Sequence, residues 1–184
     1  DAEYRQAAAR TAVSFARFWN AEAGYCYDVI DGPQGNDPTL RPNQILAVSL
    51  PHSPLTPEQQ RAVVEVCERE LLTPYGLRSL APGDPAFVPH YEGDVRQRDS
   101  AYHQGTVWAW LMGPFVSAHL RVYGDPQRAE AFLTPLLQHV NGLGLGTIGE
   151  IFDAVPPFTP RGCFAQAWSV AEVLRVWRLL HPAT

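Results

Sequence analysis

Lysine is missing from this sequence, and several other features are scarce or absent. All 14 basic residues are arginine, and 19 acidic residues give a formal net charge of −5. Because the net charge is negative and no basic run occurs, nucleic acids and anionic membrane surfaces are poor partners. No apolar stretch approaches the roughly 20 residues that a membrane helix needs. We therefore expect a protein that binds neither nucleic acid nor membrane.

Cysteine is scarce as well, with single residues at Cys26, Cys67 and Cys163. An odd number without C-x-x-C spacing argues against a disulfide framework and against a structural zinc site. The six histidines are scattered without H-x-x-x-H spacing, and the P-loop and G-x-S-x-G motifs are absent. We therefore expect no metal and no cofactor. Free cysteines and the lack of a signal peptide favour a reducing, cytoplasmic setting.

The apolar residues of the chain mostly follow a helical period. Apolar residues recur at three- and four-residue steps, which is typical of amphipathic helices. The pattern predicts six helices, at about 4–20, 42–50, 56–72, 100–123, 125–142 and 163–180. Thr56, Pro57 and Gln59 form the expected start of the third helix, and Gly113–Pro114 is expected to kink the fourth. Residues 24–32 alternate weakly and fit a short strand or an extended loop. With no convincing sheet, we predict one all-α domain over residues 1–184.

Two long irregular stretches interrupt this helical pattern, at residues 75–99 and 142–162. Loops of this length inside a domain are usually functional or disordered. The first contains several aromatic residues, which disordered segments tend to lack. We therefore interpret the two stretches as ordered, functional loops at one end of the domain.

The segment from Gln97 to Trp110, QRDSAYHQGTVWAW, carries the first candidate site. Its polar and aromatic candidates are Asp99, Tyr102, His103, Gln104, Trp108 and Trp110. Aromatic rings stack on the apolar faces of sugars, and planar polar groups bind sugar hydroxyls, so a polyhydroxylated ligand fits this composition. The purely structural alternative is that Asp99 caps a helix, His103 is a satisfied partner and the tryptophans are core.

Two further candidates lie elsewhere in the chain. Glu150 stands in a Gly- and Pro-rich loop and could serve as a general acid or base; the alternative is an ordinary solvated carboxylate. Gln166 and Trp168 follow it closely, while Asp153 is better suited to accept structural hydrogen bonds. Arg41, Asn43 and Gln44 at a predicted helix start could bind ligand hydroxyls, or could cap the helix and pair a carboxylate.

Four segments together resemble one known family. They are RPNQILAVSLPHSPL, LLTPYGLRSL, YHQGTVWAWLMGPF and GEIFDAVPPFTPRGCFAQAWSVAEVLR, which occur in this order. They are similar to the C-terminal glucosidase region of bacterial-type glycogen debranching enzymes, the amylo-α-1,6-glucosidase family. The resemblance extends from about Phe15 to Leu180.

The resemblance implies an (α/α)6 barrel, of which this chain would be the C-terminal half. It implies hydrolysis of α-1,6-linked glucose at the branch points of glycogen or a limit dextrin, with inversion. Glu150 matches the family's general base. The family's general acid lies in an upstream TWMD-like block that is absent here. The candidates expected near the sugar are Tyr102, His103, Gln104, Trp108, Gln166, Trp168, Arg41, Asn43 and Gln44.

A chain that begins without Met and directly in a helical pattern is expected to be a fragment of a longer enzyme. Such a fragment would be inactive alone, because it lacks the acid unless Asp99 replaces it. It would also self-associate through helix faces that normally meet the missing N-terminal half. Two rival functions stay open. One is a non-catalytic helical carbohydrate-binding or scaffold domain, and the other is a related hydrolase of trehalose or short α-glucans.

Overall fold

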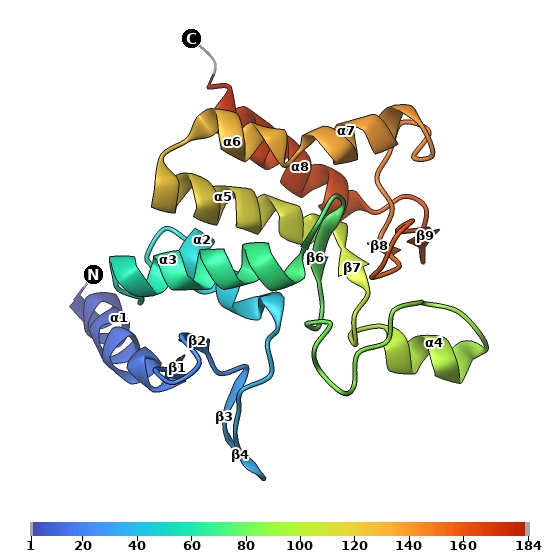
Figure 1. Ribbon diagram of the computed structural model, residues 1–184. Helices are drawn as coiled ribbons and strands as arrows, with labels where there is room; N and C mark the ends of the chain where they lie inside the picture. The colour runs from blue at the N-terminus through green and yellow to red at the C-terminus, as the bar shows by residue number, and fades with distance from the viewer. Residues whose placement is uncertain (1, 183–184) are drawn as a thin grey trace.

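Eight α-helices and three small antiparallel sheets make up residues 2–182, the part of the chain that the computed structural model describes (Figure 1). The α-helices are α1 (Ala2–Phe15), α2 (Ile45–Ser49), α3 (Pro57–Val66), α4 (Val95–Ala101), α5 (Met112–Tyr123), α6 (Pro126–Ala131), α7 (Thr134–Asn141) and α8 (Ala167–Leu180). The shorter turns are η1 (Ala16–Phe18), η2 (Pro42–Gln44), the π-helical η3 (Cys67–Leu71) and η4 (Ala109–Leu111). The strands are β1 (Trp19–Asn20), β2 (Tyr25–Cys26), β3 (Val29–Gly32), β4 (Gly35–Asp37), β5 (Leu72–Thr73), β6 (Gly76–Arg78), β7 (Val107–Trp108), β8 (Ile151–Phe152) and β9 (Pro160–Arg161).

Four helices, α2, α3, α6 and α8, pack against α5 (Figure 1). Its Phe115 and Val116 are completely buried. Burial of an apolar side chain of this size contributes about 1.5–3 kcal/mol to folding. Gly124 ends the helix with φ +63°, a left-handed conformation that glycine adopts without strain. The main core therefore lies around α5.

A five-stranded antiparallel sheet lies beside one end of this helical core, with the strand order β5-β6-β7-β8-β9. Each strand has only two or three residues. Its central strands pair Val107 with Phe152 and Trp108 with Ile151. All four of these side chains are buried, so the sheet is part of the core. Strand β7 continues through η4 directly into α5, which couples the sheet to the helices.

The predicted all-α fold, half of an (α/α)6 barrel, is wrong. About half of the chain is helical, and the described residues contain a five-stranded sheet in addition to two small hairpins. Sequence patterns did not reveal this sheet, because strands this short do not show an alternating pattern. The central strands are also distant from each other along the chain, since β7 and β8 are separated by 42 residues, from 109 to 150.

Several predicted elements are also wrong in their bounds. The expected helix at 100–123 is α4, a turn, β7, η4 and α5 in succession. Pro114 therefore lies in the first turn of α5, where its missing N–H costs nothing, and not in the middle of a longer helix. The stretch 75–99, expected to be a loop, contains β6 and part of α4, and the helix expected at 125–142 is divided into α6 and α7.

Other local predictions are confirmed. Thr56 caps α3, because its hydroxyl accepts the Gln59 N–H at 3.3 Å while the Gln59 side chain accepts the Thr56 N–H at 3.0 Å. The weakly alternating stretch 24–32 contains β2 and β3. Over residues 2–182, no helix combines the length and the apolar character needed to cross a bilayer.

Candidate active site

A cavity of about 250 Å³, here called the aromatic cavity, opens between η2, the β7–η4 segment and the start of α8. It is lined by Arg41, Pro42, Asn43, Ser79, His103, Trp108, Trp110, Leu111 and Trp168. Five of these are residues that the sequence analysis placed near a sugar: Arg41, Asn43, His103, Trp108 and Trp168. They come from three distant parts of the chain, and the fold brings them together.

The aromatic rings that line this cavity pack against one another. His103 stacks on Trp108 with ring centres 5.0 Å apart and planes at 3°. Trp168 meets Trp108 edge-on at 5.9 Å and stacks on Trp110 at 5.3 Å. Trp168 is 46% exposed, whereas Trp108 is 5% exposed. Trp168 therefore keeps ring surface available to a ligand, while Trp108 mainly supports its neighbours.

Arg41 fixes the polar side of the cavity. Its guanidinium donates to the carbonyl oxygens of Ser79 at 3.0 Å and His103 at 2.6 Å, and to Gln104 Oε1 at 2.9 Å. Asp28 lies 3.5 Å from Arg41 Nε and accepts a hydrogen bond from Asn43 at 2.9 Å. The nearby positive charge also acts on His103. Partial desolvation first, and then Arg41, lower the pKa of His103, so this ring is neutral at pH 7.

Glu150 immediately precedes β8, and both of its carboxylate oxygens have a donor. Oε1 accepts the hydroxyl of Tyr102, and Oε2 accepts the backbone N–H of Cys163 at 2.9 Å. The Glu150 N–H in turn donates to the Cys163 carbonyl at 2.9 Å. The Tyr102 ring lies 4.9 Å from Trp108 and 5.0 Å from His103, centre to centre. Tyr102 therefore connects Glu150 to the aromatic cavity.

Asp153 is the second carboxylate of this loop, and its role differs. Its side chain is 3% exposed and accepts from Arg161 Nη2 at 3.0 Å, from the Tyr91 N–H at 2.9 Å and from His90 at 3.3 Å. Desolvation raises the pKa of Asp153, but the bonds from Arg161, Tyr91 and His90 outweigh it and lower the pKa. Asp153 is thus a buried, ionised anchor, as its sequence context suggested.

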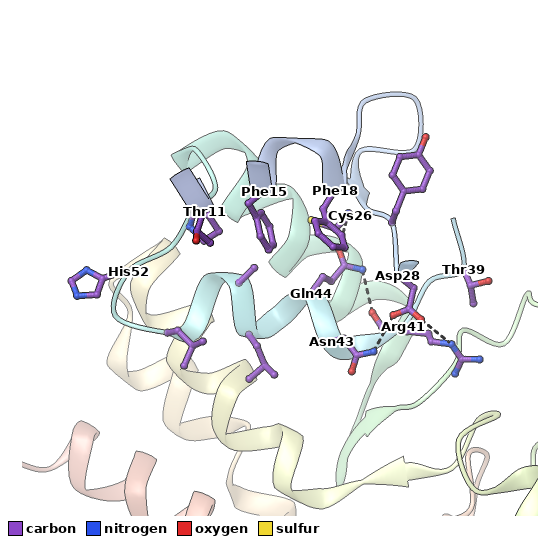
Figure 2. Close-up of a pocket in the computed structure, with 15 residues that line it drawn as sticks. Thr11, Phe15, Phe18, Cys26, Asp28, Thr39, Arg41, Asn43, Gln44 and His52 are labelled. Atoms are coloured by element: carbon purple, nitrogen blue, oxygen red, sulfur yellow. Dashed lines mark hydrogen bonds and ion pairs between the residues drawn. The ribbon is translucent and has the colours of Figure 1, made fainter. Parts of the chain in front are cut away.

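A second cavity, of about 390 Å³, lies between the α1–η1 segment and α2 (Figure 2). Phe15 and Phe18 point into it from one wall, and Asp28, Arg41 and Asn43 lie at one end (Figure 2). The two cavities share Arg41 and Asn43.

Six of the sequence candidates do not line the aromatic cavity: Glu150 and Tyr102, described above, and four more. Asp99 is an exposed residue of α4, and it does not cap that helix, because Asp94 does. Gln104 is bound by Arg41, and Gln44 lines the second cavity while accepting the Cys26 N–H at 3.2 Å. Gln166 precedes α8, and its backbone N–H donates to the Ile148 carbonyl at 2.9 Å.

Sequence reasoning missed several members of the site. Ser79, Pro42 and Leu111 line the aromatic cavity without any motif to mark them. The Cys163 backbone N–H is also a functional group that no side-chain pattern reveals. The preceding Gly162, in the segment PRGC, was the available signal, because its φ of +67° marks a special turn.

Metal and nucleotide sites find no support in the described part of the chain. No group of three His, Cys, Asp or Glu residues within residues 2–182 could hold a metal ion. The pattern G-x-G-x-x-G does occur at 144–149, but it connects α7 to β8. A dinucleotide-binding motif runs from a strand into a helix, the opposite order.

The chain belongs to the amylo-α-1,6-glucosidase family, whose model matches residues 1–175. It is also similar to the glycogen debranching enzyme of Saccharomyces cerevisiae, with 32% identity over 93 residues. That match covers 47% of this chain and 6% of the yeast protein. The resemblance recognised from the four sequence segments is therefore confirmed at the level of the family.

Solved structures share the fold. An uncharacterised conserved protein from Thermus thermophilus has a TM-score of 0.64 and 22% identity, over 92% of this chain and 40% of that chain. The mannosylglycerate hydrolase of family GH63 from the same organism, in complex with Tris, has a TM-score of 0.62 and 20% identity, over 93% and 37%. The chain thus spans 40% or less of the length of these two neighbours.

Proposed function

We propose that this chain contributes the general base and part of the sugar-binding wall to a glycoside hydrolase that releases α-1,6-linked glucose from branched α-glucans with inversion. The observation that carries the proposal is the hydrogen bond to the Glu150 carboxylate from Tyr102, whose ring contacts His103 and Trp108 of the aromatic cavity. Membership of the amylo-α-1,6-glucosidase family supports the same bond specificity. A cytoplasmic location stays a prediction.

The aromatic cavity has the chemistry that a glucose residue requires. The half-exposed Trp168 offers a ring face for the C–H surface of the sugar. Asn43 lies on the wall, where its amide nitrogen donates to Asp28 at 2.9 Å and its amide oxygen has the chemistry to accept from a sugar hydroxyl. The neutral His103 ring can donate one hydrogen bond and accept another.

An inverting glycosidase needs a second carboxyl group, roughly 6.5–9.5 Å from the base, to protonate the leaving oxygen. Within residues 2–182, no aspartate or glutamate lines the aromatic cavity, and Glu150 is connected to it only through Tyr102. Asp153 is committed to Arg161, and Asp99 lies outside the cavity on α4. We therefore propose that the general acid comes from another segment of a longer protein. The isolated chain would then be inactive, and its exposed apolar residues would favour self-association.

The test measures glucose release from a branched limit dextrin by the full-length protein and by its Glu150→Gln variant. We expect kcat to fall by about 10³-fold, within the range that loss of a general base produces, while the dextrin still binds. Glu65→Gln is the matched control, because Glu65 also accepts from a tyrosine hydroxyl but lies elsewhere on the surface. The isolated chain should release no glucose.

Other outcomes separate the rival functions. Unchanged turnover in the Glu150→Gln variant would exclude Glu150 as the base. Binding of dextrin without any hydrolysis by the full-length protein would favour a carbohydrate-binding domain. Hydrolysis of trehalose or of linear maltooligosaccharides, with the branched dextrin left intact, would assign a different α-glucoside.

A further inference from the structure

The carboxylate of Glu150 is bound on both sides at once. The Tyr102 hydroxyl donates to Oε1 and the Cys163 N–H to Oε2. The last torsion of a glutamate side chain is broad when nothing restricts it. One donor on each oxygen restricts that torsion, so the plane of the carboxylate is fixed by two groups from different parts of the fold.

Gly162 leaves the space in which the Glu150 carboxylate reaches the Cys163 N–H. The residue has φ +67°, in the left-handed region. A Cβ built on Gly162 would lie 2.6 Å from Glu150 Oε2 and 3.1 Å from Ile151 Cγ1. Any side chain at position 162 would therefore push the carboxylate away from the Cys163 N–H.

The other donor, Tyr102, is itself held firmly. Its carbonyl accepts hydrogen bonds from Thr106 Oγ1 at 2.5 Å and from Trp108 Nε1 at 3.2 Å. Its ring also contacts Tyr91, with centres 5.5 Å apart. Burial first, and then the bond to Glu150, raise the pKa of Tyr102, so the hydroxyl keeps its proton at neutral pH and can donate.

From this geometry we infer that Tyr102 and Gly162 are positioning residues, which together fix the orientation of the Glu150 carboxylate. This inference rests on the proposed function, in which Glu150 is the base. The sequence placed Tyr102 among the residues that bind the sugar. In this inference the Tyr102 hydroxyl binds Glu150, and other groups bind the sugar hydroxyls.

The test uses the full-length protein and a branched limit dextrin, and compares Tyr102→Phe and Gly162→Ala with the unmodified protein. Misplacement of a reacting group by about 1 Å can cost about 10²-fold in rate. We therefore expect each substitution to lower kcat by roughly ten- to a hundred-fold, while KM changes by no more than about two-fold. Crystal structures of the two variants should show the Glu150 carboxylate displaced or in several orientations.

The chain provides a matched control for each substitution. Tyr123→Phe removes a tyrosine hydroxyl bound to Glu65 at the surface. Gly124→Ala places a side chain at a similar φ of +63°, where no atom lies within 4 Å of the new Cβ. Both controls should keep kcat and KM, so loss of activity through backbone strain alone is separated from loss through Glu150.

The outcomes distinguish the two proposals. If Glu150→Gln abolishes turnover while Tyr102→Phe and Gly162→Ala keep full kcat, the positioning role is wrong and the proposed function stands. If Glu150→Gln keeps full turnover, the proposed function fails. The crystal structures then decide the positioning role alone, because an unchanged carboxylate in both variants would overturn it.

Discussion

The two cavities of this molecule differ in chemistry more than in size. The aromatic cavity is the smaller, at about 250 Å³ against about 390 Å³. Its walls combine indole rings, an imidazole, an amide and a hydroxyl, and Tyr102 connects it to the carboxylate of Glu150. The second cavity is mainly apolar, with its charged groups gathered at one end (Figure 2). The proposed function therefore assigns hydrolysis to the smaller cavity, on the chemistry of its walls and not on its volume.

Two carboxylates also differ: Asp153, three residues after Glu150 in the chain, and Asp28, which lines the second cavity. Asp153 is 3% exposed and has three partners, which anchor residues 90–91 to the loop after β8. Asp28, between the cavities, is 15% exposed and binds Arg41 and Asn43. Asp153 is thus a buried, paired charge, which binds the backbone of Tyr91, the residue whose ring contacts Tyr102. The second cavity borders a charge that water reaches and screens.

The largest effect on stability is expected from Asp153→Asn. The substitution removes the buried negative charge that pairs with Arg161. It should lower the free energy of unfolding by about 2 kcal/mol. The matched change, Asp28→Asn, removes a more exposed charge and should cost about 1 kcal/mol. Thermal unfolding of both variants at pH 7 measures the difference. Equal losses would remove the contrast between the two carboxylates.

The pH dependence of this loss follows from the lowered pKa of Asp153. A carboxyl group whose pKa is lower in the folded state contributes stability above its unfolded pKa, about 3.9. This contribution is lost as the pH falls through the lower folded value. The gap in Tm between the unmodified protein and Asp153→Asn should therefore be complete at pH 7 and shrink below about pH 4. A gap that does not change with pH would contradict the ionised state of Asp153.

The sequence predicted the local helical elements better than the sheet. Capping groups such as Thr56 and Gln59 lie three residues apart, so one short segment contains all the information that places the helix start. The sheet depends on pairs such as Val107 with Phe152, which only the folded chain brings together. The single helix predicted at 100–123 is wrong because β7 has only two residues, too few to show a strand pattern between the helical segments.

The candidate site was predictable to the extent that residue type reveals chemistry. Indole, imidazole and amide side chains indicated a sugar, and five of the expected residues do line one cavity. Their hydrogen-bond partners were not predictable, because Gln104 and Tyr102 are occupied by Arg41 and Glu150 from distant segments. Backbone donors such as the Cys163 N–H carry no residue signature at all.

The substitution Trp168→Ala tests whether the aromatic cavity, and not the second cavity, binds the sugar. The variant loses the exposed ring face, so KM for the branched dextrin should rise by about ten-fold while kcat changes less. Trp177→Ala is the control on the same helix, because Trp177 is also partly exposed but does not line the cavity. Kinetics of the full-length protein give both values. An unchanged KM in Trp168→Ala would remove Trp168 from the sugar-binding wall.

The smallest effect is expected from Phe18→Ala, in the second cavity. Phe18 stacks on Phe15 with ring centres 5.0 Å apart, and both rings are only partly buried. Loss of this contact should lower the free energy of unfolding by about 1 kcal/mol, and KM for the branched dextrin should stay within about two-fold. Thermal unfolding and kinetics on the same preparation separate the two quantities. A KM that rises as much as in Trp168→Ala would break the comparison, because the substrate would then extend past Arg41 into the second cavity.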